Sequence, residues 1–107
     1  MNMLSRAEET VLLAVVRLDG EAYGLSIRRF IREALGIEWS LAQIYNPLDR
    51  LTQKGYLRRY LGPPTAERGG RHKCLYRITP EGKDALAELR RIHLRLWQGA
   101  AGKARLG

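Results

Sequence analysis

Residues 62–71 are rich in glycine and proline and separate two short stretches in which apolar residues alternate. Residues 56–61 and 73–79 have the two-residue period, and the aromatic and aliphatic content, of strands with one buried face. Two such stretches joined by a glycine-containing loop are typical of an antiparallel hairpin. The sequence therefore predicts one β-hairpin, and the cations in its loop give it a long, basic tip.

Two pairs of polar residues mark the starts of helices. Ser5 with Glu8, and Ser40 with Gln43, have the spacing of a capping box. In this motif each side chain of the pair bonds a backbone N–H at the first turn of a helix. Apolar residues follow both pairs at helical spacing. The sequence therefore predicts one helix that begins near residue 6 and another that begins near residue 41.

The remaining elements are predicted from apolar periodicity, glycine and proline. Apolar residues at helical spacing predict a second helix that begins near Gly24. Residues 37–39 alternate around a charge, which suits a brief strand or an extended link. Pro47 lies inside the third helix and favours a bend there, because proline removes a backbone donor. Threonine and proline at residues 79 and 80 predict a fourth helix, which ends near residue 98.

The predicted order is helix, helix, short strand, helix, strand, wing, strand, helix. This order describes a mainly α fold with a small β-hairpin. Its second and third helices are joined by a short connection, and a basic hairpin follows them. The sequence therefore predicts a winged helix-turn-helix.

Composition excludes several classes of protein. The chain has 107 residues and a single cysteine, so it can form no internal disulfide. No Cys/His set has the spacing of a zinc site, and we expect neither a metal nor a cofactor. The longest apolar run, residues 11–16, is far shorter than the about 20 residues that span a membrane. We therefore expect a soluble, cytoplasmic protein of one folded unit.

The net charge of +8 is unevenly placed along the chain. Residues 1–40 carry a net charge of −1, whereas residues 41–107 carry +9. Such asymmetry favours a polyanion as partner, and the alternative is that the charge serves only solubility.

Polar side chains on the third helix and cations in the wing point to double-stranded DNA as that polyanion. Asparagine and glutamine pair with adenine and arginine pairs with guanine, while a helix start with small residues can approach a phosphate. Glycines let the wing follow a groove, and its cations can contact phosphates. An ordinary solvated helix face and a loop with incidental charge are the alternatives. The candidate DNA-binding residues are Ser40, Ala42, Gln43, Tyr45, Asn46, Arg50, Arg68, Arg71 and Lys73.

Three stretches of the sequence together carry a family resemblance. The first is Tyr23-Gly24, the second comprises residues 39–45, 48–51 and 54–57, and the third comprises residues 62–71 and 76–82. The third stretch is the most specific, because it contains Pro-Thr-Ala-Glu-Arg-Gly-Gly-Arg in the wing. With these stretches the chain resembles the PadR-like transcriptional regulators, which are winged-helix repressors. The resemblance extends from about residue 5 to about residue 97.

The resemblance implies a DNA-binding homodimer whose third helix enters the major groove. The family's tyrosine in this helix falls on Tyr45. The family often places proline directly after that tyrosine, whereas here Asn46 precedes Pro47. The resemblance also implies that the last helix forms the dimer. We therefore expect a DNA-binding domain over residues 1–79, a dimerisation helix over residues 80–98 and a flexible tail over residues 99–107.

The last helix independently shows the spacing of a coiled-coil seam, although a face that covers only the chain's own core is the alternative. The candidate interface residues are Leu86, Leu89, Ile92, His93, Leu96 and Trp97. Two-fold symmetry would place two recognition helices about 34 Å apart, which matches a pseudo-palindromic site. At such a seam Trp97 could stack a small aromatic effector, as in some short PadR-like proteins, or could simply pack in the interface.

The sequence thus predicts a sequence-specific DNA-binding transcriptional regulator, a repressor that acts as a homodimer on a pseudo-palindromic operator. The alternative is a winged-helix adaptor that binds a protein and no specific DNA. Such an adaptor would show little salt-dependent binding to a duplex. We do not expect an enzyme, because the sequence contains no Ser/His/Asp grouping and no phosphate-loop motif.

Overall fold

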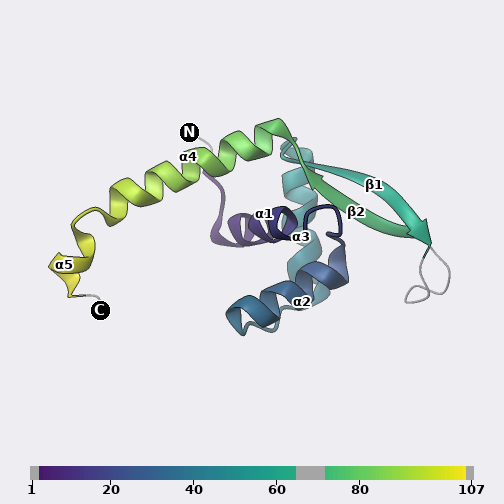
Figure 1. Cartoon of the computed structure of the whole chain (residues 1–107), viewed down its shortest axis with the longest axis horizontal. Coiled ribbons are helices and arrows are strands. Elements are labelled where there is room, and N and C mark those ends of the chain that lie inside the picture. The colour runs from purple at the N-terminus through teal and green to yellow at the C-terminus, as the bar shows by residue number, and fades with distance from the viewer. Residues whose placement is uncertain (1–2, 65–71, 106–107) are drawn as a thin grey trace.

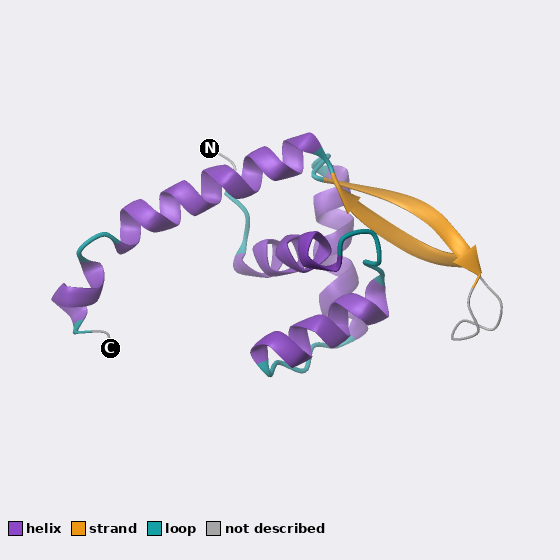
Figure 2. Cartoon of the chain, in the orientation of Figure 1, coloured by secondary structure: helices purple, strands orange, loops and turns teal. Residues whose placement is uncertain are grey.

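The computed structural model describes residues 3–64 and 72–105. This part of the chain contains five helices and one two-stranded sheet (Figures 1 and 2). In chain order the elements are α1 (Arg6–Leu18), α2 (Gly24–Leu35), α3 (Leu41–Gln53), β1 (Leu57–Pro64), β2 (His72–Ile78), α4 (Pro80–Trp97) and α5 (Ala100–Ala104). The fold is mainly helical with one antiparallel hairpin, as the sequence predicts.

The helices begin where the capping motifs predict. Ser5 Oγ accepts a hydrogen bond from the Glu8 N–H at 3.1 Å, and Glu8 Oε1 accepts one from the Ser5 N–H at 2.8 Å. Ser40 and Gln43 make the same exchange at the start of α3, at 3.2 Å and 2.8 Å. Thr79 accepts a backbone N–H at the start of α4, where proline occupies the first helical position. Each cap satisfies backbone donors that a helix start otherwise leaves unpaired.

The first three helices pack around one hydrophobic core, and β2 and α4 complete it. Apolar residues at helical spacing place one face of each helix in this core. α3 is unbroken from Leu41 to Gln53 although it contains Pro47, whose side chain is buried. The largest fully buried side chains are Tyr76, Leu12, Ile27, Ile31, Ile44, Leu48, Leu51 and Val11.

The two strands pair as the predicted hairpin. From here on, the wing means the two strands together with the loop that joins them. Leu57 pairs with Ile78 and Tyr60 pairs with Leu75 in an antiparallel register. The register shifts between Leu61 and Pro64, near the end of β1. Figure 2 shows the two strands extending away from the helices. The predicted basic tip, with Arg68 and Arg71, lies outside the described residues.

The brief strand expected at residues 37–39 does not form. Gly36 ends α2 in the left-handed region, at φ 70°, and Ser40 caps α3. Only a short extended link therefore remains, which was the alternative. Ala22, which lies between α1 and α2, forms an isolated β-bridge with Tyr76 of β2, and its carbonyl accepts the Tyr76 N–H at 2.9 Å.

α4 begins beside the wing and then leaves the helical core (Figure 1). Leu89 is buried, and Ala85 and Leu86 pack against the core. Residues 100–104, in the segment expected to be a tail, form the short helix α5. Among the helices of the described ranges, none is long and apolar enough to cross a bilayer.

Candidate nucleic-acid interface

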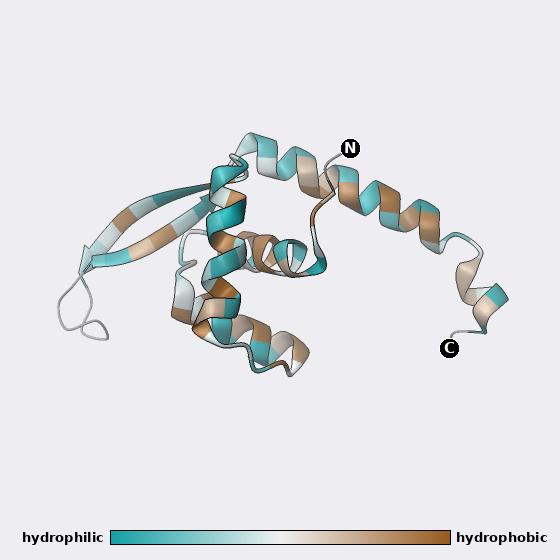
Figure 3. Cartoon of the chain, turned by 180° about the vertical axis from the view of Figure 1, so that it is seen from behind, coloured by the Kyte–Doolittle hydropathy of each residue, from teal (hydrophilic) through white to brown (hydrophobic). Residues whose placement is uncertain are grey.

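α3 has one buried face and one exposed polar face. Ile44, Leu48 and Leu51 are fully buried, which turns the opposite side of the helix outward. In Figure 3 α3 lies on the near side of the molecule, and the strands of the wing extend to one side of it. The predicted positions that are exposed are Ser40, Ala42, Gln43, Asn46 and Arg50, and Gln53 near the end of α3 is exposed as well.

Ser40 and Gln43 bond to each other's backbone N–H at the start of α3. Gln43 Oε1 accepts the N–H of Ser40, so the carboxamide oxygen is used by the cap. Its amide nitrogen is left as a donor. Asn46, one turn later, is exposed, and both the oxygen and the nitrogen of its side-chain amide remain available within the described part of the chain. Of the two amides expected to contact bases, Asn46 is therefore the one that can offer a donor and an acceptor together.

Tyr45 is half-buried and lies against the first turn of α2. A Cβ placed on Gly24 would come within 2.2 Å of the Tyr45 hydroxyl oxygen and 2.5 Å of the ring carbon that bears it. No side chain can occupy that space while Tyr45 stays in place. The Tyr-Gly pair before α2 and the tyrosine of α3 are thus two halves of one contact between the helices of the helix-turn-helix.

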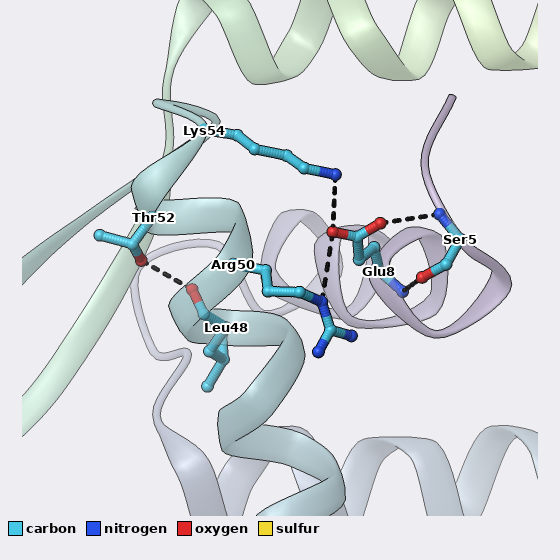
Figure 4. Close-up of polar contacts among 6 residues, drawn as sticks. All are labelled: Ser5, Glu8, Leu48, Arg50, Thr52 and Lys54. Carbon is cyan, nitrogen blue, oxygen red and sulfur yellow. Dashed lines mark hydrogen bonds and ion pairs between the residues drawn. The ribbon is translucent and has the colours of Figure 1, made fainter. Parts of the chain in front are cut away.

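Glu8 joins the start of α1 to the last two turns of α3 (Figure 4). Only 3% of the residue is exposed. Its Oε2 accepts a hydrogen bond from Lys54 Nζ at 2.8 Å and lies 3.6 Å from Arg50 Nε. Burial opposes ionisation of Glu8, but Lys54 and Ser5 together hold the pKa of its carboxyl below the ordinary value. Arg50, a predicted DNA contact, therefore lies beside an ionised carboxylate of its own chain.

The described part of the wing carries several exposed cations. Arg58 on β1 stands directly opposite Arg77 on β2, and both are exposed. Like charges that face each other across a hairpin repel, and a polyanion would relieve that repulsion. Alternation predicts the two strands but not which residues face each other, so this pair becomes evident only from the register in the structure. Lys73 lies with its Nζ 4.4 Å from the centre of the Tyr23 ring, close to the start of α2.

The sequence matches one known protein family. The family described as the PadR-like transcriptional regulators matches residues 12–88, which is most of the chain. This chain belongs to the PadR-like family of transcriptional regulators. The family consists of regulators, not of enzymes. No curated protein matches the chain.

Solved structures share the fold of this PadR-like chain. A transcriptional regulator from Clostridium thermocellum is 23% identical over 94% of this chain and 97% of that one, with a TM-score of 0.70. A PadR family regulator from Clostridium difficile is 26% identical over 92% of this chain and 98% of that one, with a TM-score of 0.67. PadR of Bacillus subtilis, in complex with operator DNA, is 27% identical over 77% of this chain and 45% of that one, with a TM-score of 0.62.

The second half of α4 in this PadR-like chain is largely uncovered. Leu94, Leu96 and Trp97 expose 63%, 69% and 56% of their surface. Leu94 and Trp97 line a groove of about 500 Å³ between α1 and α4, together with Leu13 of α1. The heptad spacing did not select Leu13 or Leu94. Leu13 belongs to α1, and the packing of α4 beside α1 brings it to the same groove as Leu94.

The other predicted interface residues lie closer to the chain's own core. Leu89 is buried, Leu86 packs against the core, and Ile92 is half-buried. His93 Nε2 lies 3.3 Å from Glu9 Oε2, which links α4 to α1. Of the six predicted residues, Leu96 and Trp97 therefore present the most surface to a partner.

Proposed function

We propose that this PadR-like regulator binds DNA by inserting α3 into the major groove, with the wing along the flanking backbone. The observation that carries the proposal is the exposed polar face of α3 beside a basic wing, in a chain of this family. The positive charge beyond residue 40 supports it, because phosphate neutralisation drives association with DNA. The structure of Bacillus subtilis PadR in complex with operator DNA supports DNA as the partner.

Within this interface we assign roles by chemistry. Asn46 reads a base edge, and Gln43 can add a donor through its free amide nitrogen. Ser40 and Ala42 let the start of α3 approach a phosphate closely. The half-buried Tyr45 sets the angle between α2 and α3. We assign backbone and minor-groove contacts to the wing cations Arg68, Arg71 and Lys73. Arg50 is omitted from the base-reading set because its Nε faces Glu8.

We further propose that the protein acts as a homodimer. Residues 1–79 form the DNA-binding unit in this proposal, residues 80–98 form the dimerisation helix, and residues 99–107 are a tail. The exposed apolar side chains Leu94, Leu96 and Trp97 support this division, because an isolated chain would leave them in water. Two-fold symmetry then predicts a pseudo-palindromic operator with half-sites about 34 Å apart, or a multiple of that distance.

We propose that the protein acts as a repressor. A dimer held on an operator can block transcription by occupancy alone, and it needs no additional contact surface for polymerase. Because its target is DNA, we place its activity in the cytoplasm. Repression is tested with a reporter under the protein's own upstream DNA, whose expression should rise when the protein is removed.

A small aromatic effector is a second, separate proposal that rests on the groove between α1 and α4. Trp97 lines this apolar groove beside Leu94, and an exposed indole can stack on a flat ring. Its test is tryptophan fluorescence in a Trp39→Phe background, which leaves Trp97 as the reporter. Quenching by aromatic compounds that also releases DNA supports the proposal. Fluorescence that responds to no aromatic compound tried would count against it.

The DNA-binding proposal is tested by titration with two duplexes at several salt concentrations. One duplex carries the DNA upstream of the protein's own gene, and the other has random sequence of equal length. If about six phosphates are contacted, log K falls with log salt at a slope near −5. An adaptor that binds only proteins would show little salt-dependent binding to either duplex.

A further inference from the structure

Glu8 is a buried carboxylate whose partners lie on the proposed recognition helix. It comes from the first turn of α1, and its carboxylate contacts the side chains of Lys54 and Arg50 near the end of α3. Figure 4 shows both of these side chains extending from α3 towards Glu8. The sequence places Arg50 on the polar face of α3, but the structure turns its Nε towards α1.

The contacts also hold the carboxylate itself in place. Glu8 Oε1 accepts the Ser5 N–H at 2.8 Å, which leaves Oε2 for the two cations. Lys54 has the shorter contact and the more buried side chain, with 27% exposed, whereas Arg50 keeps 49% exposed. One fixed negative charge therefore holds two cations near the end of α3, and Arg50 is the one that the helical phase places on its polar face.

From this arrangement we infer that Glu8 limits sequence-independent DNA binding by holding Arg50 and Lys54 against α1. The inference rests on the proposed DNA-binding function and adds a specificity-determining role for a residue outside the DNA surface. Cations that contact phosphates raise affinity for every sequence alike. A regulator gains specificity when fewer of its cations contribute to that common affinity, because non-specific sites compete with the operator. Glu8 acts through Arg50 and Lys54, so it is a positioning residue.

Glu8→Gln is the direct test, since glutamine keeps an oxygen that can accept the Ser5 N–H and removes only the charge. The variant should bind random duplex about two- to eightfold more tightly near 0.1 M salt, with a slope steeper by up to about 0.9 for each cation released. Its ratio of operator to random affinity should fall. Asp84→Asn is the control, because it changes the net charge equally at an exposed position on α4.

A mutant cycle shows whether the effect passes through the two cations. In an Arg50→Gln, Lys54→Gln background, Glu8→Gln should leave random-duplex affinity unchanged. An unchanged slope in the single variant, or an equal gain in the double-mutant background, would overturn the inference. A gain of the same size and slope in Asp84→Asn would also overturn it, because net charge alone would then explain the effect.

Arg50→Gln alone provides a test that does not disturb Glu8 or its bond to Lys54, and it applies even if the Glu8 variant fails to fold. We expect less than a twofold change in random-duplex affinity and an unchanged salt slope. A slope that falls by about 0.9 would mean that Arg50 contacts a phosphate, which contradicts the inference. If the unaltered protein shows no salt-dependent duplex binding, the proposed function itself fails. If it binds and only the variants behave otherwise, the inference alone fails.

Discussion

The Lys54 ammonium donates a hydrogen bond of 2.8 Å to the buried Glu8 carboxylate, and this bond joins the start of α1 to the end of α3. Glu8 belongs to the first turn of α1, and Lys54 follows the last turn of α3. Hydrogen bonds between charged groups contribute more to stability than neutral ones, and a buried carboxylate that loses its partner is costly. This contact therefore ties the orientation of α3 to the state of one carboxyl group.

The stability of the fold should depend on the ionisation of Glu8. The folded protein lowers the pKa of Glu8 below its ordinary value of 4.5. Its contribution to the free energy of unfolding is present above pH 4.5 and is lost as the pH falls through the lower, folded pKa. We expect Glu8→Gln to be less stable at pH 7, by about 1–3 kcal/mol, and the deficit to shrink in acid. Urea unfolding of both proteins at several pH values measures this, and a deficit that stays constant with pH would contradict it.

Gly24 should be intolerant of any side chain for as long as Tyr45 occupies its site. Gly24→Ala would place a methyl group against the hydroxyl end of the Tyr45 side chain, so the tyrosine must swing out or α2 must shift. Overpacking of this kind costs about 1–3 kcal/mol, and it should also weaken DNA binding through the changed angle between α2 and α3. Thermal unfolding and duplex titration measure the two effects.

Tyr45→Ala supplies the control for the Gly24 prediction. With the ring removed, Gly24→Ala should no longer destabilise the protein, because the three atoms nearest to the added methyl group all belong to Tyr45. A Gly24→Ala variant that is equally destabilising with and without the ring would show that another contact is responsible.

Self-association should depend on the exposed end of α4. Leu94→Glu places a charge in the groove beside Trp97 and should shift the protein from dimer to monomer without unfolding it, since 63% of Leu94 is exposed. Leu61→Glu is the matched control, because Leu61 is 73% exposed but lies on β1. Sedimentation analysis distinguishes the species. A Leu94→Glu protein that remains dimeric would place the interface elsewhere.

Much of this fold was predictable because its signals are local. The caps at Ser5 and Ser40, the helical periodicity and the alternation in the wing each depend on residues close together in sequence. The strand considered at residues 37–39 does not form, and the alternative, an extended link, is found. Alternation over only three residues does not distinguish the two, because a strand also needs a pairing partner from elsewhere in the chain.

The finer details of the candidate site were not predictable from periodicity. The same spacing that made Gln43 a cap also placed it on the polar face, and only the structure shows its oxygen bonded to Ser40. Arg50 has the helical phase of an exposed residue, but Glu8 reaches it from an element far away in the sequence. Leu94 falls outside a 3-4 seam and gains its importance from the neighbouring α1.

The most direct test of DNA recognition by α3 is the ratio of operator affinity to random-duplex affinity, measured at one salt concentration with and without Asn46. Recognition by α3 predicts a ratio of at least about 10³ for the unaltered protein. In Asn46→Ala the ratio should fall by about 5- to 150-fold, the equivalent of 1–3 kcal/mol, with little change in random-duplex affinity. Lys83→Ala, on α4, should leave the ratio unchanged. A ratio near one in the unaltered protein, or an unchanged ratio in Asn46→Ala, would contradict recognition by this face of α3.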